Sequence, residues 1–191
     1  YQSKFNFGTR TGIDLPGEGT GILFSEENMN EMVLATSAFG QGFTCTMIQE
    51  ISAMAAAING GTYYQPHLVK SVTDQDGKVL ENITPTVMKE PISEEVSAAV
   101  REYMGMSVES GTSQSAKVQG YSMGGKTGTA EKLADDTKDN YLVSFIGFAP
   151  LDDPEVLIYV VVDTPNVDSQ ASSTYAQYLA QAILSEVLPY M

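Results

Sequence analysis

The stretch Gly124-Gly125-Lys126-Thr127-Gly128-Thr129-Ala130-Glu131, with the two apolar segments that follow it, decides how this sequence folds. Residues 141–149 and 155–163 are apolar at nearly every position, which is typical of strands that are covered on both faces. The connections between the segments are short, whereas a parallel neighbour would need a long crossover. We therefore predict three antiparallel strands, at 121–131, 141–149 and 155–163.

The rest of the chain is predicted to add helices and short strands around this sheet. The expected elements are a helix within 26–39, a helix over 46–59 that Gly60 and Gly61 end, strands near 64–73 and 78–81 with a turn at Asp76-Gly77, a helix capped by Ser93, and a helix over 172–188. The expected buried stripes are Met47, Ile48, Ile51, Met54, Ala55 and Ile58; Val96, Val100, Tyr103 and Met104; and Tyr175, Leu179, Ala182, Ile183 and Val187. The predicted class is α/β of the α+β type, an antiparallel sheet flanked by helices.

Composition excludes several classes of function. At 191 residues the chain fits one domain or a large piece of one. A formal charge of −14 without a basic stripe argues against nucleic-acid binding. Cys45 is the only cysteine, so an internal disulfide cannot form, and we expect it to be a small core residue. The longest apolar run, 156–162, is too short to cross a bilayer, and residues 1–20 lack a secretion signal.

The segment 124–131 also carries chemistry. Its glycines remove side-chain bulk around one cation, Lys126, and two hydroxyls, Thr127 and Thr129. Glycine inside a strand often marks the close approach of a ligand or another backbone. A fixed cation, hydroxyls and bare backbone amides together suit a carboxylate and a developing oxyanion.

A phosphate-binding loop is the competing interpretation of this segment. Gly120 and Gly125-Lys126-Thr127 satisfy the pattern G-x-x-x-x-G-K-T, and the strand that ends at Asp163 resembles a Walker B strand. However, residues 113–119 are mostly polar where a buried strand is needed, and Gly128 interrupts the expected helix. A nucleotide hydrolase is therefore the weaker alternative.

Several motifs, in order, resemble class B penicillin-binding proteins. The family's Lys-Thr-Gly motif lies on an edge strand that faces the nucleophile. The matching segments are the extended motif 124–131, the loop Thr11-Gly12-Ile13-Asp14-Leu15-Pro16-Gly17-Glu18, Gly40-Gln41-Gly42 with Thr46 and Gln49, Val108 with Gly111-Thr112, and Phe145-Ile146-Gly147-Phe148-Ala149-Pro150. The resemblance covers nearly the whole chain and implies that residues 1–191 are the C-terminal portion of one transpeptidase domain.

The resemblance implies a reaction and a location. A serine would attack the penultimate D-Ala carbonyl of a peptidoglycan stem peptide and release the terminal D-Ala, and an amine of a second stem would then take the acyl group. β-Lactams would acylate the same serine. The family needs no cofactor or metal. The parent protein would lie at the extracytoplasmic face of the bacterial membrane, anchored by a transmembrane helix absent from this chain.

The resemblance also assigns residue roles. Lys126 would supply positive charge to the substrate carboxylate and tune the proton relay, and the hydroxyls of Thr127 and Thr129 would hydrogen-bond that carboxylate. The Thr129 N–H would be an oxyanion-hole donor, and Gly128 would let the substrate backbone lie against the strand. We also infer that the negative charge of Glu131 weakens the binding of anionic β-lactams, although a merely solvated carboxylate is equally compatible with the sequence.

The sequence departs from the family at its first two motifs. No serine precedes a lysine by three residues, and none is followed two residues later by asparagine, so the Ser-x-x-Lys and Ser-x-Asn segments are absent. We therefore expect a missing N-terminal half and no activity of this polypeptide alone. A non-catalytic β-lactam sensor or scaffold of the same fold stays open as a second function.

Other polar residues have plainer interpretations. His67 lacks a local serine or acid that would make it a general base, so a structural role is favoured. The pairs Asp135-Asp136, in the predicted hairpin connection 133–140, and Asp152-Asp153 fit solvated turns better than a metal site.

Overall fold

The structure of the chain is a computed structural model that describes residues 1–132 and 140–191. It divides into two compact units, Tyr1–Ser93 and Glu94–Met191, and each is described by itself. Across the described residues, none of the helices has the length and apolar character needed to cross a membrane. The predicted hairpin connection at 133–140 lies outside the described residues except for Asn140.

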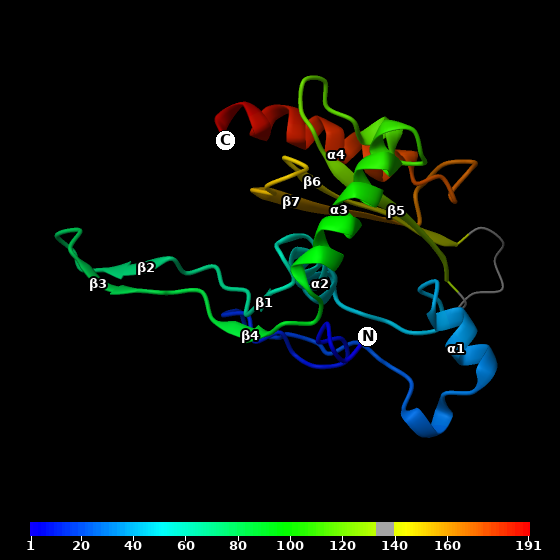
Figure 1. Cartoon of the computed structure of the whole chain (residues 1–191), viewed down its shortest axis with the longest axis horizontal. Coiled ribbons are helices and arrows are strands. Elements are labelled where there is room, and N and C mark those ends of the chain that lie inside the picture. Colours follow the sequence, from blue (N-terminus) through cyan, green and yellow to red (C-terminus); the bar gives the residue numbers. More distant parts are fainter. Residues whose placement is uncertain (133–139) are drawn as a thin grey trace. The chain divides into compact units, whose positions relative to one another are not determined.

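The second unit is built on a three-stranded sheet, drawn in yellow-green to brown in Figure 1. Its strands are β5 (Gly124–Glu131), β6 (Tyr141–Ala149) and β7 (Val156–Asp163), in the order β5-β6-β7, and both pairings are antiparallel. This confirms the predicted sheet and class, although the first strand begins at Gly124 rather than at residue 121. β6 is buried from Val143 to Ala149, as its continuous apolar run predicts, and β5 is an edge strand.

Helices flank this sheet. They are α3 (Glu94–Glu109), η2 (Gln114–Ala116), α4 (Thr174–Val187) and η3 (Leu188–Tyr190). α4 lies along the sheet (Figure 1), where Ala176 and Ala180 pack on Phe145 of β6 and on alternate residues of β7. α3 packs against β5. α4 therefore covers β6 and β7 while α3 covers the edge strand β5, and the sheet gains the cover that its apolar residues need.

The predicted contact face was wrong for α4 and only partly right for α3, where Met104 is buried as expected. In α4 the buried residues are Ala176, Gln177, Ala180 and Leu184, while Leu179 is 51% exposed. In α3 they are Ser97, Met104, Gly105 and Val108, while Val96 and Tyr103 are exposed. Close packing explains both errors. In α3 a Cβ on Gly105 would lie 2.8 Å from Leu151 Cδ2, and in α4 the small residues Ala176 and Ala180 pack on Phe145. Small residues bring the helix axis near its partner, and larger ones are displaced to the rim.

The first unit carries one long helix and two small sheets. Its elements are η1 (Glu26–Asn28), α1 (Glu31–Ser37), α2 (Met47–Ile58), β1 (Tyr63–Tyr64), β2 (Ser71–Thr73), β3 (Val79–Asn82) and β4 (Val87–Lys89). β1 pairs with β4 and β2 pairs with β3, both antiparallel. The helix predicted over 46–59 is confirmed, because Thr46 and Gln49 cap α2 reciprocally. The turn at Asp76-Gly77 is confirmed between β2 and β3.

Several expectations for this unit were wrong. The helix within 26–39 is two pieces, since the Asn30 side chain caps α1 separately. The strand at 64–73 is interrupted, because Pro66 lacks the N–H that a ladder needs. β4 was not predicted. On α2 Ile58 is buried as predicted, but the other buried residues are Gln49, Ser52, Ala53 and Ala56, whereas Met47 is 53% exposed. Cys45 is exposed rather than part of a core.

Candidate functional site

The predicted site residues lie together on the edge strand β5. Lys126 and Gly128 pair with Ile146 and Ser144 of β6, whereas Thr127, Thr129 and Glu131 pair with Phe145, Val143 and Tyr141. Side chains alternate along a strand, so the two threonines and Glu131 share one face. Lys126 and Thr129 are exposed and Thr127 is half-buried. The strand therefore presents a cation and hydroxyls at an accessible sheet edge.

The glycines of β5 have a packing reason that the sequence did not reveal. A Cβ on Gly125 would lie 2.5 Å from Cζ of Phe145, and a Cβ on Gly124 would collide with the ring of Phe148. A Cβ on Gly128 would lie 2.5 Å from Oγ of Ser144. All three neighbours belong to β6. The structure thus explains these glycines by close approach of β6 side chains, without a ligand.

Three polar contacts converge on the outer edge of β5. Lys126 Nζ donates to the carbonyl of Thr127 over 2.7 Å, and the buried Ser113 hydroxyl donates to the carbonyl of Gly125 over 3.4 Å. The Thr112 and Thr127 hydroxyls are 3.3 Å apart. Carbonyls two residues apart point to the same side of a strand, together with their own N–H groups. By the same period, the Thr129 N–H points to this outer edge.

Thr129 has a partner outside the strand. Its hydroxyl donates to the carbonyl of Ala171 over 3.4 Å, in the segment between β7 and α4. The single proton of that hydroxyl is therefore directed at Ala171 in this state, whereas its lone pairs and the backbone N–H remain for other partners. Glu131, at the end of the strand, is exposed.

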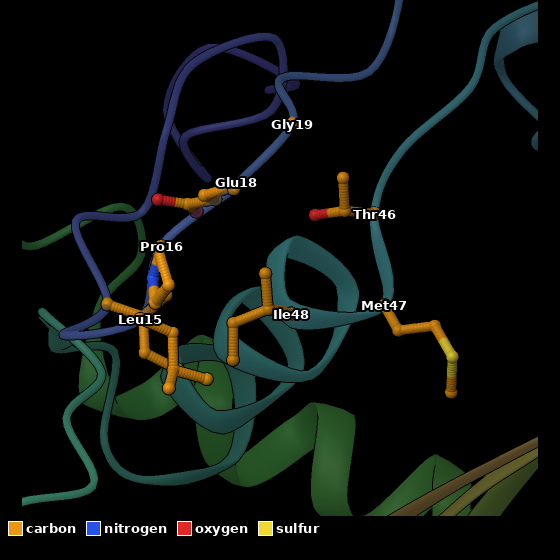
Figure 2. Close-up of a pocket in the computed structure, with 9 residues that line it drawn as sticks. Leu15, Pro16, Glu18, Gly19, Thr46, Met47 and Ile48 are labelled. Atoms are coloured by element: carbon orange, nitrogen blue, oxygen red, sulfur yellow. The ribbon is translucent and has the colours of Figure 1, made fainter.

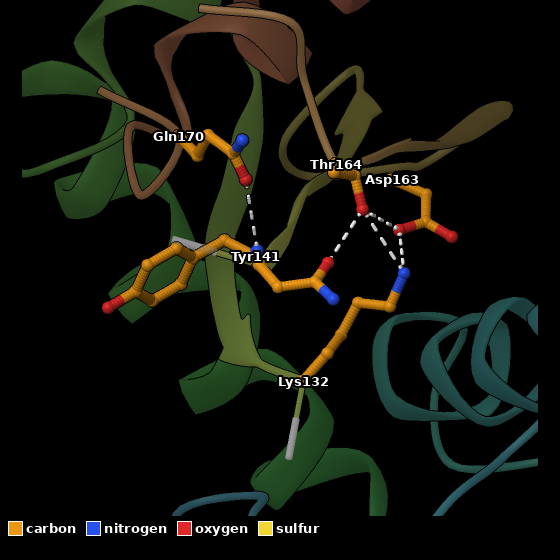
Figure 3. A network of polar contacts seen from close by, with 6 residues as sticks. Lys132, Tyr141, Asp163, Thr164 and Gln170 are labelled. Atoms are coloured by element: carbon orange, nitrogen blue, oxygen red, sulfur yellow. Dashed lines mark hydrogen bonds and ion pairs between the residues drawn. The ribbon is translucent and has the colours of Figure 1, made fainter. Parts of the chain in front are cut away.

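A polar network that the sequence analysis missed lies where β5 ends (Figure 3). Lys132 Nζ is 2.6 Å from Asp163 Oδ1 and 3.1 Å from the Thr164 hydroxyl. The Thr164 hydroxyl also reaches Asn140, and the backbone N–H of Tyr141 donates to Gln170. The Lys132 ammonium lowers the pKa of the Asp163 carboxyl, with help from the Thr164 hydroxyl. The network joins the ends of all three strands.

In the first unit, the loop 11–18 is held by its own polar side chains. Glu18 accepts hydrogen bonds from the N–H and hydroxyl of Thr11, each 2.6 Å, and from the N–H of Gly12. Asp14 accepts from the N–H groups of Leu68 and Val69, and these bonds lower the pKa of its carboxyl. Glu18 and Asp14 therefore hold this loop in place by hydrogen bonds, a role that the sequence pattern alone does not predict.

Gln49 fixes the base of the same loop. Its amide nitrogen donates to the carbonyls of Thr9 over 2.7 Å and Thr20 over 2.9 Å, while its oxygen accepts from the N–H of Thr46. The residue is completely buried. One side chain thus caps α2 and joins both ends of the loop.

A pocket of about 420 Å³ lies between this loop and the start of α2 (Figure 2). Its walls are mainly apolar, and Leu15 and Met47 on its rim are exposed. The other lining residues are Ile13, Pro16, Gly17, Glu18, Gly19, Thr46 and Ile48. The pocket contains none of the residues predicted to act on a substrate.

His67 and the described aspartate pair Asp152-Asp153 are not surrounded by other groups that would form a catalytic or metal site. His67 Nδ1 lies 2.9 Å from the carbonyl of Val69, a local contact. Within residues 1–132 and 140–191, no three His, Cys, Asp or Glu side chains gather as they would around a metal ion. Asp152 and Asp153 are exposed in the turn between β6 and β7, and Asp135 and Asp136 lie outside the described residues.

The phosphate-loop alternative is wrong. Residues 124–131 form a strand that pairs with β6 in antiparallel register along its whole length. A phosphate loop would open a helix between parallel strands. Lys126 and Thr127 instead lie in the middle of an edge strand, and β7, with Asp163 at its end, is antiparallel to β6.

An antiparallel sheet with a Lys-Thr-Gly edge strand, flanked by helices, defines a class of acyl-transfer enzymes. The family described as the penicillin binding protein transpeptidase domain matches residues 1–186. The chain belongs to this family, as its ordered motifs predicted.

Curated relatives agree with this assignment. The chain is 45% identical to Stage V sporulation protein D of Bacillus subtilis, covering 99% of the chain and 30% of that protein. It is 32% identical to penicillin-binding protein PbpB of Mycolicibacterium smegmatis, covering 85% of the chain and 26% of the relative. The chain therefore spans between 26% and 30% of the length of these relatives.

Solved structures share the fold. Penicillin binding protein 3 of Mycobacterium tuberculosis in its apo form has a TM-score of 0.87 and 28% identity, covering 99% of this chain and 45% of that one. The same protein complexed with ampicillin has a TM-score of 0.85. A peptidoglycan synthetase of Bifidobacterium adolescentis, 30% identical, also has a TM-score of 0.85 and is covered to 35%.

Proposed function

We propose that this chain is the C-terminal portion of a D,D-transpeptidase domain that cross-links peptidoglycan stem peptides by acyl transfer. The observation that carries the proposal is the accessible edge of β5, which places Lys126, the Thr127 hydroxyl and the Thr129 N–H along one strand. Relatives named as probable peptidoglycan D,D-transpeptidases support it, as does the solved relative complexed with ampicillin. The stem peptide that ends in D-Ala-D-Ala and the β-lactams are the proposed ligands.

Each residue of the strand has a proposed part in the reaction. Lys126 attracts the carboxylate of the substrate and tunes the proton relay, and the hydroxyls of Thr127 and Thr129 bind the same carboxylate. The Thr129 N–H stabilises the oxyanion, a group whose loss costs about 2.7–4 kcal/mol of barrier in comparable sites. Gly128 leaves the strand flat where the substrate backbone pairs with it. For Thr129, binding an anion through the hydroxyl requires its proton to turn away from Ala171.

The attacking serine comes from elsewhere in the domain. The chain contains neither Ser-x-x-Lys nor Ser-x-Asn, so its partner is the N-terminal half of the transpeptidase domain that holds those motifs. We infer that the intact protein acts at the extracytoplasmic face of the cell membrane, anchored by a helix in that other part. The 45% identity to a sporulation protein makes the spore envelope the setting to examine first.

The test of this function compares the intact domain with this chain. A fluorescent penicillin should label the intact domain, and Lys126→Ala should lower the labelling rate at least tenfold, because the anion loses its fixed cation. Lys117→Ala is the matched control, since Lys117 pairs on the surface with Glu109 and such pairs contribute little. The 191-residue chain should stay unlabelled.

Two results would oppose the proposal. Stable labelling of the isolated chain would show that it holds its own nucleophile. Labelling of the intact domain without transfer of a D-Ala-D-Ala peptide to an amine would support the alternative, a β-lactam sensor or scaffold of the same fold.

A further inference from the structure

The turn after α3 brings one hydroxyl to the site that the proposed function does not use. Thr112 follows Gly111 directly, and its side chain reaches the Thr127 hydroxyl of β5 at 3.3 Å. Thr112 is exposed, whereas its neighbour Ser113 is fully buried. The turn therefore has one residue that anchors it and one that faces the accessible edge of the strand.

The turn is anchored by a chain of hydrogen bonds around the buried Ser113. The Ser113 hydroxyl lies 2.8 Å from the Ser107 hydroxyl of α3 and donates to the carbonyl of Gly125 in β5. The N–H groups of Gly111 and Ser113 both donate to the carbonyl of Ser107. A Cβ on Gly111 would lie 2.9 Å from Cα of Ser107, so only glycine fits this tight turn. These contacts fix the position of Thr112 relative to β5.

The distance between the two hydroxyls suits a shared acceptor. A separation of 3.3 Å is long for a bond between hydroxyls, which prefer about 2.7–2.8 Å. An oxygen atom placed beside the pair can lie about 2.8 Å from both, and an anionic acceptor takes stronger hydrogen bonds than a hydroxyl does. The Lys126 ammonium, at the carbonyl of Thr127, supplies positive charge at the same residue.

We propose that Thr112 is a substrate-binding residue, whose hydroxyl joins that of Thr127 in holding one carboxylate oxygen of the stem peptide or β-lactam. Without ligand the two hydroxyls satisfy one another, and the anion replaces their mutual bond with two charge-assisted ones. This proposal rests on the proposed function of β5.

The experiment measures acylation of the intact domain by benzylpenicillin and by its methyl ester, which lacks the negative charge. Thr112→Val keeps the shape but removes the hydroxyl, and should slow acylation by benzylpenicillin at least about tenfold, as expected for the loss of one hydrogen bond to a charged group. The ester rate should stay within about twofold, because a neutral ester gains little from the hydroxyl. Thr112→Ser should restore the wild-type rate for the acid.

Ser110→Ala is the control, since Ser110 is an exposed neighbour whose hydroxyl donates to the carbonyl of Met106 on its own helix. An equal loss on acid and ester, or unchanged rates with both, would overturn the role of Thr112 while labelling of the wild type still supported the proposed function. An unlabelled wild-type domain would overturn both.

Discussion

At the scale of single residues, Glu131 ends the face of β5 that carries the site hydroxyls. It pairs with Tyr141 and lies two positions beyond Thr129, about 7 Å along the strand. A like charge at that distance from a bound carboxylate, in water, weakens binding by about 0.6 kcal/mol. Glu131→Gln in the intact domain should therefore raise the acylation rate by an anionic penicillin about two- to threefold.

The salt dependence of the acylation rate tests whether charge repulsion by Glu131 is the cause. The advantage of Glu131→Gln should shrink when sodium chloride is raised from about 20 mM to about 500 mM, because exposed charges are screened. The methyl ester of the same penicillin should react equally with both proteins. A gain that persists with the ester would mean that Glu131 acts through shape rather than charge.

Cys45 is the one thiol of the chain, and its surroundings suppress its reactivity. Partial desolvation of the thiol and the neighbouring Glu50 carboxylate together raise its pKa to about 11, with Sγ and Oε2 3.7 Å apart. Since the thiolate is the nucleophile, alkylation by iodoacetamide at pH 7 should be about a hundredfold slower than for a free cysteine of pKa about 8.5. Glu50→Gln should accelerate it, and a rate equal to that of free cysteine would contradict this account.

At the scale of elements, the loop 11–18 depends on a charged carboxylate. Burial opposes the charge on Glu18, but the hydroxyl and N–H of Thr11 and the N–H of Gly12 lower its pKa overall. A group with a lowered folded pKa stabilises the fold above its unfolded pKa of about 4.3, and the contribution disappears as the pH falls through the folded value. Glu18→Gln should thus reduce the free energy of unfolding at pH 7 by about 1 kcal/mol, after allowance for solvent.

Thermal unfolding between pH 3 and pH 7 measures this difference. The wild type and Glu18→Gln should converge as the pH falls through the lowered folded pKa, where the native carboxyl also becomes protonated. Glu81→Gln, on the exposed strand β3, should follow the wild type throughout. If the difference in Tm between the wild type and Glu18→Gln grew as the pH fell, the proposed stabilisation by the charged carboxylate would be contradicted.

The elements also show what the sequence could predict. The antiparallel sheet and the capped helix α2 follow from local patterns, namely continuous apolar runs, short connections, and the pair Thr46 and Gln49. The contact faces of α3 and α4 do not, because periodicity favours the largest apolar residues as the buried ones, whereas Gly105 and Ala180 make the close contacts. β1 has two residues, too few for any periodicity, and its pairing with β4 depends on tertiary contacts.

The residues of the candidate site also differ in whether the sequence could predict them. Lys126, Thr127 and Thr129 could be predicted, because one strand places them by its two-residue period. Thr112 could not, since its position depends on a turn that the buried Ser113 fixes. Gly111-Thr112 is visible as a motif, but the geometry of the turn, and with it a role for Thr112, cannot be deduced from the sequence.

At the scale of the whole molecule, charge is the dominant feature. The chain has 24 acidic and 10 basic residues and a formal charge of −14 at pH 7. Repulsion among so many like charges favours expansion, whereas screening relieves it. Raising sodium chloride from about 20 mM to about 300 mM should therefore increase the Tm of the chain by a few degrees at pH 7.

A variant with fewer negative charges distinguishes charge repulsion from other effects of salt on the Tm. Asp152→Asn with Asp153→Asn removes two negative charges from the exposed turn between β6 and β7, so the formal charge becomes −12. This double variant should have a higher Tm than the wild type at low salt, and the two should approach one another at about 300 mM, because screening leaves less repulsion to remove. Choline chloride at equal ionic strength should act like sodium chloride, since screening depends on ionic strength rather than on the cation. If the Tm gap between variant and wild type were the same at all salt concentrations, the turn residues would act through local structure, and the repulsion would not limit stability.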